Sequence, residues 1–125
     1  MVKNKKSGLS VRLSEVVIQG MQERKGNEIV RLDLRNIHSS VSDYFVICHA
    51  DSSTQVNSLA KSVEEEVYKA LQQEPWRKEG LAHGEWILLD FVDVVVHIFK
   101  TDKRKYYGIE DLWGDAELEY YQSAS

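Results

Sequence analysis

Two carboxylates and a histidine lie close together in the sequence between Asp90 and His97. Asp90 and Asp93 flank a predicted two-residue turn, Phe91-Val92, and His97 follows on the strand-like segment after it. Carboxylates in this arrangement could hold a magnesium ion for phosphoryl transfer. That chemistry also needs a phosphate-binding Gly-Ser turn, and the chain has no Gly-Ser dipeptide. We therefore predict no enzymatic activity and no metal or other cofactor, with a minimal magnesium-dependent enzyme as the alternative.

Cys48 and His49 are adjacent and could be interpreted as a nucleophile and its base. Neighbouring side chains on a strand point to opposite faces, so these two side chains cannot readily meet. We predict that Cys48 is a buried structural residue. A single cysteine also excludes an internal disulfide and is typical of a reducing compartment, so we expect a cytoplasmic protein.

Two charged runs are further candidates for binding. Glu64-Glu65-Glu66 falls on the polar face of a predicted helix, with Lys69 four residues after Glu65, which is typical of a solvated face. Lys103-Arg104-Lys105 precedes Tyr106-Tyr107 and has the basic and aromatic mixture of an RNA contact. Because acidic residues flank this second run, we favour local helix charge over RNA binding.

The segments that must position these residues form a predicted hairpin over residues 85–99, rich in β-branched and aromatic residues. The predicted register pairs Asp90 with Asp93, Leu88 with Val95 and Trp86 with His97. Alternation then gives an aliphatic face, made of Ile87, Leu89, Val94, Val96 and Ile98, which we expect to be core. The opposite side, called here the second face, carries Trp86, Leu88, Asp90, Asp93, Val95, His97 and Phe99. Opposed carboxylates cost roughly 0.2–1 kcal/mol, so this face is predicted to bind a cationic partner.

The remaining pattern predicts an α/β fold, of the α+β type, with a single mixed five-stranded sheet and two main helices. One helix is expected from residue 10, and a second is expected to begin after one of several possible N-caps at 51–54 and to end before Pro75. Strands are expected at 28–34, 44–49 and 76–79, and short helical turns at 103–107 and 109–113. Two helices with one apolar stripe each would cover only the aliphatic face. The second face is therefore expected to be bare, and exposed apolar patches mark partner sites.

The composition fits one domain. The chain has 125 residues, a net charge of −4 and no apolar run approaching the roughly 20 residues that span a bilayer. Six Lys and Arg lie in residues 1–25, whereas the remainder has ten basic and eighteen acidic residues. Because Lys and Arg contacts to phosphates dominate nucleic-acid binding, a basic protein is the better electrostatic partner. Residues 1–9 are predicted to be a disordered lead, 10–116 the domain and 117–125 a frayed acidic tail.

The motifs together resemble one known family. The chain resembles the ribosomal silencing factor family, also called Iojap-related proteins, in seven segments. These are Asp43-Tyr44-Phe45-Val46-Ile47, Ser52-Ser53, Val63-Glu64-Glu65-Glu66, Glu79-Gly80, Glu85 to Asp90, Asp93 to Phe99 and Leu112-Trp113-Gly114-Asp115. The resemblance implies a nucleotidyltransferase-like topology without that activity, and the magnesium-dependent alternative is a minimal nucleotidyltransferase-like enzyme. It implies binding to the large ribosomal subunit through its protein L-fourteen, which blocks joining of the small subunit and represses translation under nutrient limitation.

The resemblance also bears on individual residues. Trp86 matches the family's interface tryptophan, and Glu79, Asp90 and Asp93 match its acidic positions. The chain departs from the family at Val92, where a glycine is usual in the hairpin turn. With the face assignment, this gives a predicted partner-binding set of Glu79, Trp86, Leu88, Asp90, Asp93, Val95 and His97. A self-associating module that pairs its Trp86 faces is a further alternative, and a free homodimer is compatible with ribosome binding.

Overall fold

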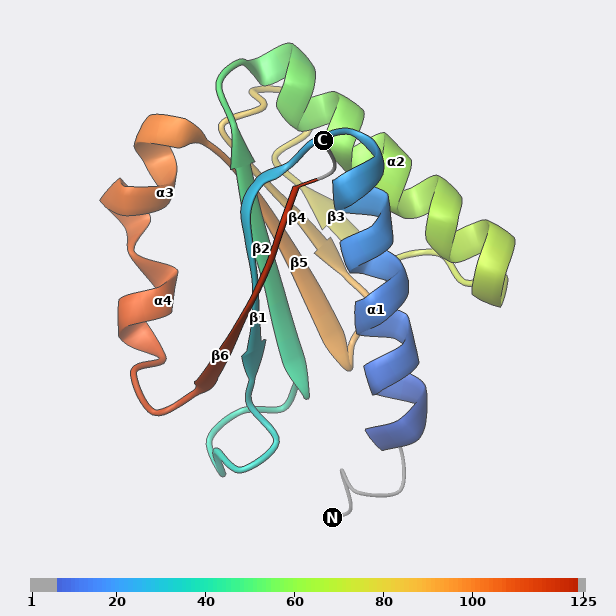
Figure 1. Cartoon of the computed structure of the whole chain (residues 1–125), viewed down its shortest axis with the longest axis vertical. Helices are drawn as coiled ribbons and strands as arrows, with labels where there is room; N and C mark the ends of the chain where they lie inside the picture. The colour runs from blue at the N-terminus through green and yellow to red at the C-terminus, as the bar shows by residue number, and fades with distance from the viewer. Residues whose placement is uncertain (1–6, 124–125) are drawn as a thin grey trace.

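The computed structural model describes residues 7–123, which form a mixed sheet with helices on both sides (Figure 1). The elements are α1 (Ser7–Glu23), β1 (Asn27–Asp33), β2 (Tyr44–Ala50), α2 (Ser53–Leu71), β3 (Arg77–Glu79), β4 (Trp86–Asp90), β5 (Val94–Lys100), α3 (Thr101–Tyr107), α4 (Ile109–Leu112) and β6 (Glu117–Tyr121). This confirms the predicted fold class. No helix within residues 7–123 is long and apolar enough to cross a membrane.

The two long helices pack on each other and on one side of the sheet. Ser52, one of the possible N-caps at 51–54, caps α2 by accepting a hydrogen bond from the Gln55 N–H at 3.2 Å. A Cβ on Gly20 of α1 would lie 2.8 Å from the Val63 Cα, so only glycine permits this approach to α2. The Ser62 hydroxyl also donates to the Gly20 carbonyl at 2.7 Å. The helices and sheet bury the aliphatic face of the hairpin, as predicted.

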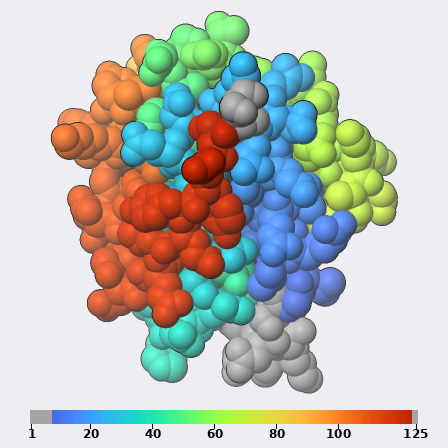
Figure 2. Space-filling view, viewed as in Figure 1, coloured from blue at the N-terminus to red at the C-terminus, as the bar shows by residue number. Residues whose placement is uncertain are grey.

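The sheet order is β3-β4-β5-β2-β1-β6, with β2 and β5 parallel and all other pairs antiparallel. The structure therefore has six strands where five were expected. The extra strand, β6, uses residues 117–121 of the segment predicted to fray, and in Figure 2 it lies on the surface between α1 and the α3–α4 segment. Its pairing with β1 is reinforced by Arg31, whose Nε donates to Glu119 Oε1 at 2.9 Å.

The predicted lead is also partly ordered, because residues 7–9 belong to the first turn of α1. Residues 1–6 of that lead, and residues 124–125 of the predicted tail, lie outside the described residues. The short strand expected at 76–79 is present as β3 at one edge of the sheet. The two predicted helical turns near the C-terminus are present as α3 and α4.

The hairpin register differs from the prediction by two residues. Trp86 lies opposite Phe99 and Asp90 opposite Val95, so the two carboxylates are not cross-strand neighbours. The Phe91 N–H donates to the Val94 carbonyl at 2.9 Å, which makes Val92-Asp93 the two-residue turn. Because the displacement is an even number of residues, the two faces keep their predicted membership on the strands.

Val92 occupies the first position of this turn. Its φ is +77°, a region that β-branched residues disfavour. Its N–H donates to Asp90 Oδ1 at 2.8 Å, and its carbonyl accepts from the Ser42 hydroxyl at 2.9 Å. The Asp93 N–H donates to the Phe91 carbonyl at 3.0 Å, spanning Val92. These bonds hold Val92 in a conformation that its β-branched side chain alone opposes.

The prediction of a bare second face is wrong. A second core lies on this side of the sheet and contains Val30, Leu32, Leu34, Ile47, Phe99 and Ile109, with Phe45, Trp86 and Trp113 packed partly against it. Figure 1 shows α3 and α4 on this side, opposite α1 and α2. The two short helices contribute only Arg104 and Ile109 as buried residues, so no apolar stripe announces that they cover a sheet.

Candidate functional site

Trp86 lies at the border between the covered and the accessible part of the second face. Its ring stacks on Phe99 with a centroid distance of 5.0 Å, and Tyr107 of α3 packs against it at 4.6 Å. Its indole N–H donates to Nδ1 of His97 at 3.1 Å. The side chain remains partly exposed. Trp86 is therefore both a member of the second core and a surface residue.

His97 is only 3% exposed, so it does not form a contact surface itself. Its ring lies edge-on to Phe45 with centroids 4.7 Å apart. Burial lowers the pKa of His97 to about 3, which leaves the imidazole neutral near pH 7. Because Nδ1 accepts the indole hydrogen bond, the proton of the neutral ring is on Nε2. Within the described residues, Nε2 has no hydrogen-bond partner.

The other predicted contact residues lie at different depths. Val95 is buried, whereas Leu88 on β4 is partly exposed. Leu88 lies between His97 of β5 and Glu79 of β3. The structure thus brings Trp86 and Leu88 together as the accessible apolar residues of β4 and places Val95 and His97 beneath the surface.

Arg77 on β3 neutralises part of the acidic rim. Its Nη1 lies 2.9 Å from Glu79 Oε2, and its Nη2 lies 3.4 Å from Asp90 Oδ2. An internal cation therefore takes the place that was predicted for a partner's cation. Exposed ion pairs contribute about 0–1 kcal/mol, so Glu79 can exchange Arg77 for a partner at little cost. Asp93 is partly exposed in the turn, where its carbonyl accepts the Asp43 and Tyr44 N–H groups.

Sequence reasoning missed four apolar neighbours of this region. Phe45 and Trp113 are partly exposed and meet edge-to-face at 5.7 Å, while Tyr107 is 41% and Leu112 is 77% exposed. The family motif at residues 112–115 pointed to Trp113, but only the path of α3 and α4 shows that these residues border the second face. We define the accessible patch as Phe45, Trp86, Leu88, Tyr107, Leu112 and Trp113.

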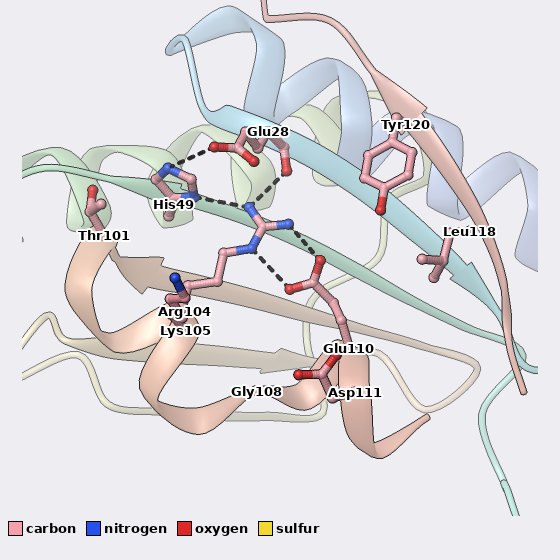
Figure 3. A pocket seen from close by; sticks show the side chains of 10 residues that line it. All are labelled: Glu28, His49, Thr101, Arg104, Lys105, Gly108, Glu110, Asp111, Leu118 and Tyr120. Carbon is pink, nitrogen blue, oxygen red and sulfur yellow. Dashed lines mark hydrogen bonds and ion pairs between the residues drawn. The ribbon is translucent and has the colours of Figure 1, made fainter. Parts of the chain in front are cut away.

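A polar cavity of about 540 Å³ lies beside α3, between it and β6 (Figure 3). Arg104, which is 9% exposed, spans its floor. Its guanidinium donates to both carboxylate oxygens of Glu110 at 3.1 and 3.0 Å, to the Glu28 carbonyl at 2.7 Å and to His49 Nδ1 at 2.9 Å. This network fastens α3 to β1 and β2, so Arg104 of the basic run is a structural residue.

The Cys48-His49 pair is arranged as predicted. Complete burial raises the pKa of the Cys48 thiol to about 12, while burial and then the charge of Arg104 lower the pKa of His49. Cys48 lies in the core under α1 and α2, whereas His49 faces the polar cavity. A nucleophile and base pair is excluded by this separation.

Asp90, one of the two carboxylates in the alternative of a magnesium-dependent enzyme, already has protein partners. Both carboxylate oxygens of Asp90 are engaged, Oδ1 by the Val92 N–H and Oδ2 by Arg77. Among residues 7–123, no group of three or more His, Cys, Asp and Glu side chains is arranged to hold a metal ion.

Known proteins of one family match this chain over most of its length. Residues 9–124 match the family described as "Ribosomal silencing factor during starvation". A ribosomal silencing factor of Halalkalibacterium halodurans is 38% identical over 107 residues, covering 83% of this chain and 87% of the relative. The chloroplastic protein Iojap of Zea mays is 32% identical over 78 residues, covering 58% of this chain and 31% of the relative.

A solved structure has the same fold. The crystal structure of a protein from Chromobacterium violaceum is 33% identical and superimposes with a TM-score of 0.77, covering 91% of this chain and 93% of that one. The family is one of silencing factors and not of enzymes, in agreement with the sequence-based prediction. The match over nearly all described residues, with the identity to curated relatives, shows that this chain belongs to the ribosomal silencing factor family.

Proposed function

We propose that this protein is a ribosomal silencing factor that binds the large ribosomal subunit through the ribosomal protein L-fourteen. By occupying space that the small subunit needs, it blocks subunit association and represses translation under nutrient limitation. Family membership is the observation that carries the proposal, because the match extends from residue 9 to residue 124.

The surface of the second face supports a protein partner. The accessible patch combines partly exposed aromatic and aliphatic side chains with a polar rim, which is the usual anatomy of a protein interface. Trp86 and Leu88 are its accessible apolar residues on β4 and are suited to act as anchors. The proposed contact set is therefore the accessible patch together with Glu79, Asp90 and Asp93.

Charge favours a basic partner. Residues 26–125 have ten basic and eighteen acidic residues, so the body of the domain repels phosphate and attracts a basic protein. On docking, a partner's Lys or Arg would compete with Arg77 for Glu79, which is exposed. Steering by this charge predicts faster and tighter binding at low ionic strength.

Sedimentation with purified subunits tests the proposal. The protein should migrate with large subunits in a sucrose gradient and not with small subunits, and the bound fraction should fall as salt is raised. Glu79→Gln should reduce the salt dependence, whereas Glu65→Gln, at an exposed position of α2 on the other face of the sheet, serves as the matched control. Migration with small subunits, or with neither subunit, would contradict the proposal.

A further inference from the structure

His97 is a polar residue inside an otherwise apolar stretch of β5. Its neighbours on the same face, Val95 and Phe99, are buried aliphatic and aromatic residues. A buried N–H without an acceptor costs stability, and Nε2 of His97 has no partner within residues 7–123. An apolar side chain at this position would avoid that cost. Packing alone therefore does not account for histidine here.

What histidine supplies at this position is an acceptor for Trp86. Nδ1 lies 3.1 Å from the indole Nε1, on the neighbouring strand and in a diagonal position, because Trp86 itself pairs with Phe99. Burial keeps the imidazole ring neutral near pH 7, so Nδ1 remains available to accept the indole hydrogen bond at that pH. Of the side chains packed around Trp86, Phe99 has no acceptor, and the hydroxyl of Tyr107 lies at the end of an exposed ring.

The hydrogen bond restricts the indole in a way that stacking does not. Contacts with Phe99 and Tyr107 alone would not distinguish the two orientations of the indole that are related by a flip about its Cβ–Cγ bond. The bond to His97 directs the N–H edge toward β5 and so determines which edge the rest of the ring presents. A fixed rotamer lowers the entropy that a contact residue loses when it binds.

We propose that His97 is a positioning residue that fixes the Trp86 indole in the orientation presented to the ribosomal partner. This inference rests on the proposed function and deepens it, since His97 acts through Trp86 and does not touch the partner. It reassigns His97 from the contact set predicted from the sequence to the layer beneath it.

The test compares four variants of the full chain. His97→Phe removes the acceptor but keeps a ring, Trp86→Phe removes the donor, the double variant removes both, and His97→Asn keeps an acceptor near the position of Nδ1. The exposed His38→Asn is the matched control. For each, we would measure affinity for purified large subunits and urea unfolding. For the variants that keep Trp86, we would also measure hydrogen exchange of its indole N–H by NMR.

His97→Phe should remain at least as stable as the parent, exchange the indole proton faster and bind about tenfold more weakly. The same change should have no further effect in the Trp86→Phe background, and His97→Asn should restore most of the protection and affinity. His97→Phe binding as tightly as the parent would overturn the inference. The inference would also be overturned if His97→Phe weakened binding equally in the parent and in the Trp86→Phe background, because His97 would then act independently of Trp86.

Two outcomes separate this inference from the proposed function. If the parent protein does not bind large subunits, the proposed function fails. If the parent binds and Trp86→Ala weakens binding but His97→Phe does not, only the positioning role fails. Should His97→Phe not fold, the His97→Asn variant decides, since a positioning role requires that it retain indole protection and binding.

Discussion

Leu88 and Leu89 are neighbours on β4 and provide the sharpest separation of surface from core. Leu89 is fully buried on the aliphatic face, whereas Leu88 is partly exposed on the second face. The same substitution, leucine to alanine, can therefore be made at adjacent positions of one strand. The two changes remove the same atoms from opposite sides of the sheet.

The burial of each side chain determines the expected size of the effect. Leu89→Ala leaves a cavity in a closed core and should lower the free energy of unfolding by about 2–5 kcal/mol. For a domain of this size, a loss of about 3 kcal/mol corresponds to a melting temperature lower by ~10–15 °C. Leu88→Ala removes a partly hydrated group and should cost about 1 kcal/mol of stability. It should also weaken binding to large subunits by about fivefold or more, which is ~1 kcal/mol.

Urea unfolding gives the stability of each variant, and sedimentation with large subunits at a temperature where both remain folded gives the affinity. The reasoning would be refuted if both variants lost the same stability. It would also be refuted if the folded fraction of Leu89→Ala lost affinity while Leu88→Ala bound like the parent. Either result would mean that the two faces of β4 are wrongly assigned.

Three further predictions concern single residues. Val92→Gly relieves the positive φ and should raise the midpoint of urea unfolding, corresponding to about 0.5–1 kcal/mol; a lower midpoint would show that the valine side chain stabilises the turn. Burial lowers the pKa of His97 from 6.5 to about 3, so on acidification the unfolded chain binds a proton at His97 before the folded chain does. The free energy of unfolding should therefore fall as pH decreases from about 6.5 toward 3, by up to about 1.4 kcal/mol per pH unit. Urea unfolding at pH 4–7 should show that the free energy of unfolding changes less with pH in His97→Phe than in the parent. An identical pH dependence would contradict the burial of a neutral ring. The Cys48 thiol, with its pKa raised to about 12, should resist a disulfide reagent at pH 8 until urea unfolds the chain, and rapid labelling of the native protein would contradict its burial.

Local patterns predicted the parts of the fold that local physics determines. Alternation along residues 85–99 gave the aliphatic face, and the apolar stripe after the Ser52 cap gave α2. These signals act within one strand or one helix. The same alternation placed Trp86 and Leu88 on the side of the sheet that bears the accessible patch.

Long-range pairing accounts for the parts that were mispredicted. β6 has an acidic, exposed sequence, and it is held by its ladder to β1 and by the contact of Glu119 with Arg31, 88 residues away. The second face is covered because Arg104 joins α3 to His49, Glu28 and Glu110. The short basic sequence of α3 does not show that Arg104 is buried and holds this helix over the second face. For this reason His97 and Val95 were predicted to be surface residues.

Subunit joining, followed by light scattering, tests the central claim most directly. Purified large subunits would be incubated with the protein before small subunits are added, and the increase in scattering would report joined ribosomes. The protein should reduce joining in proportion to the large subunits that it occupies, and Leu88→Ala should require a higher concentration for the same effect. Normal joining by large subunits saturated with the protein would contradict the account.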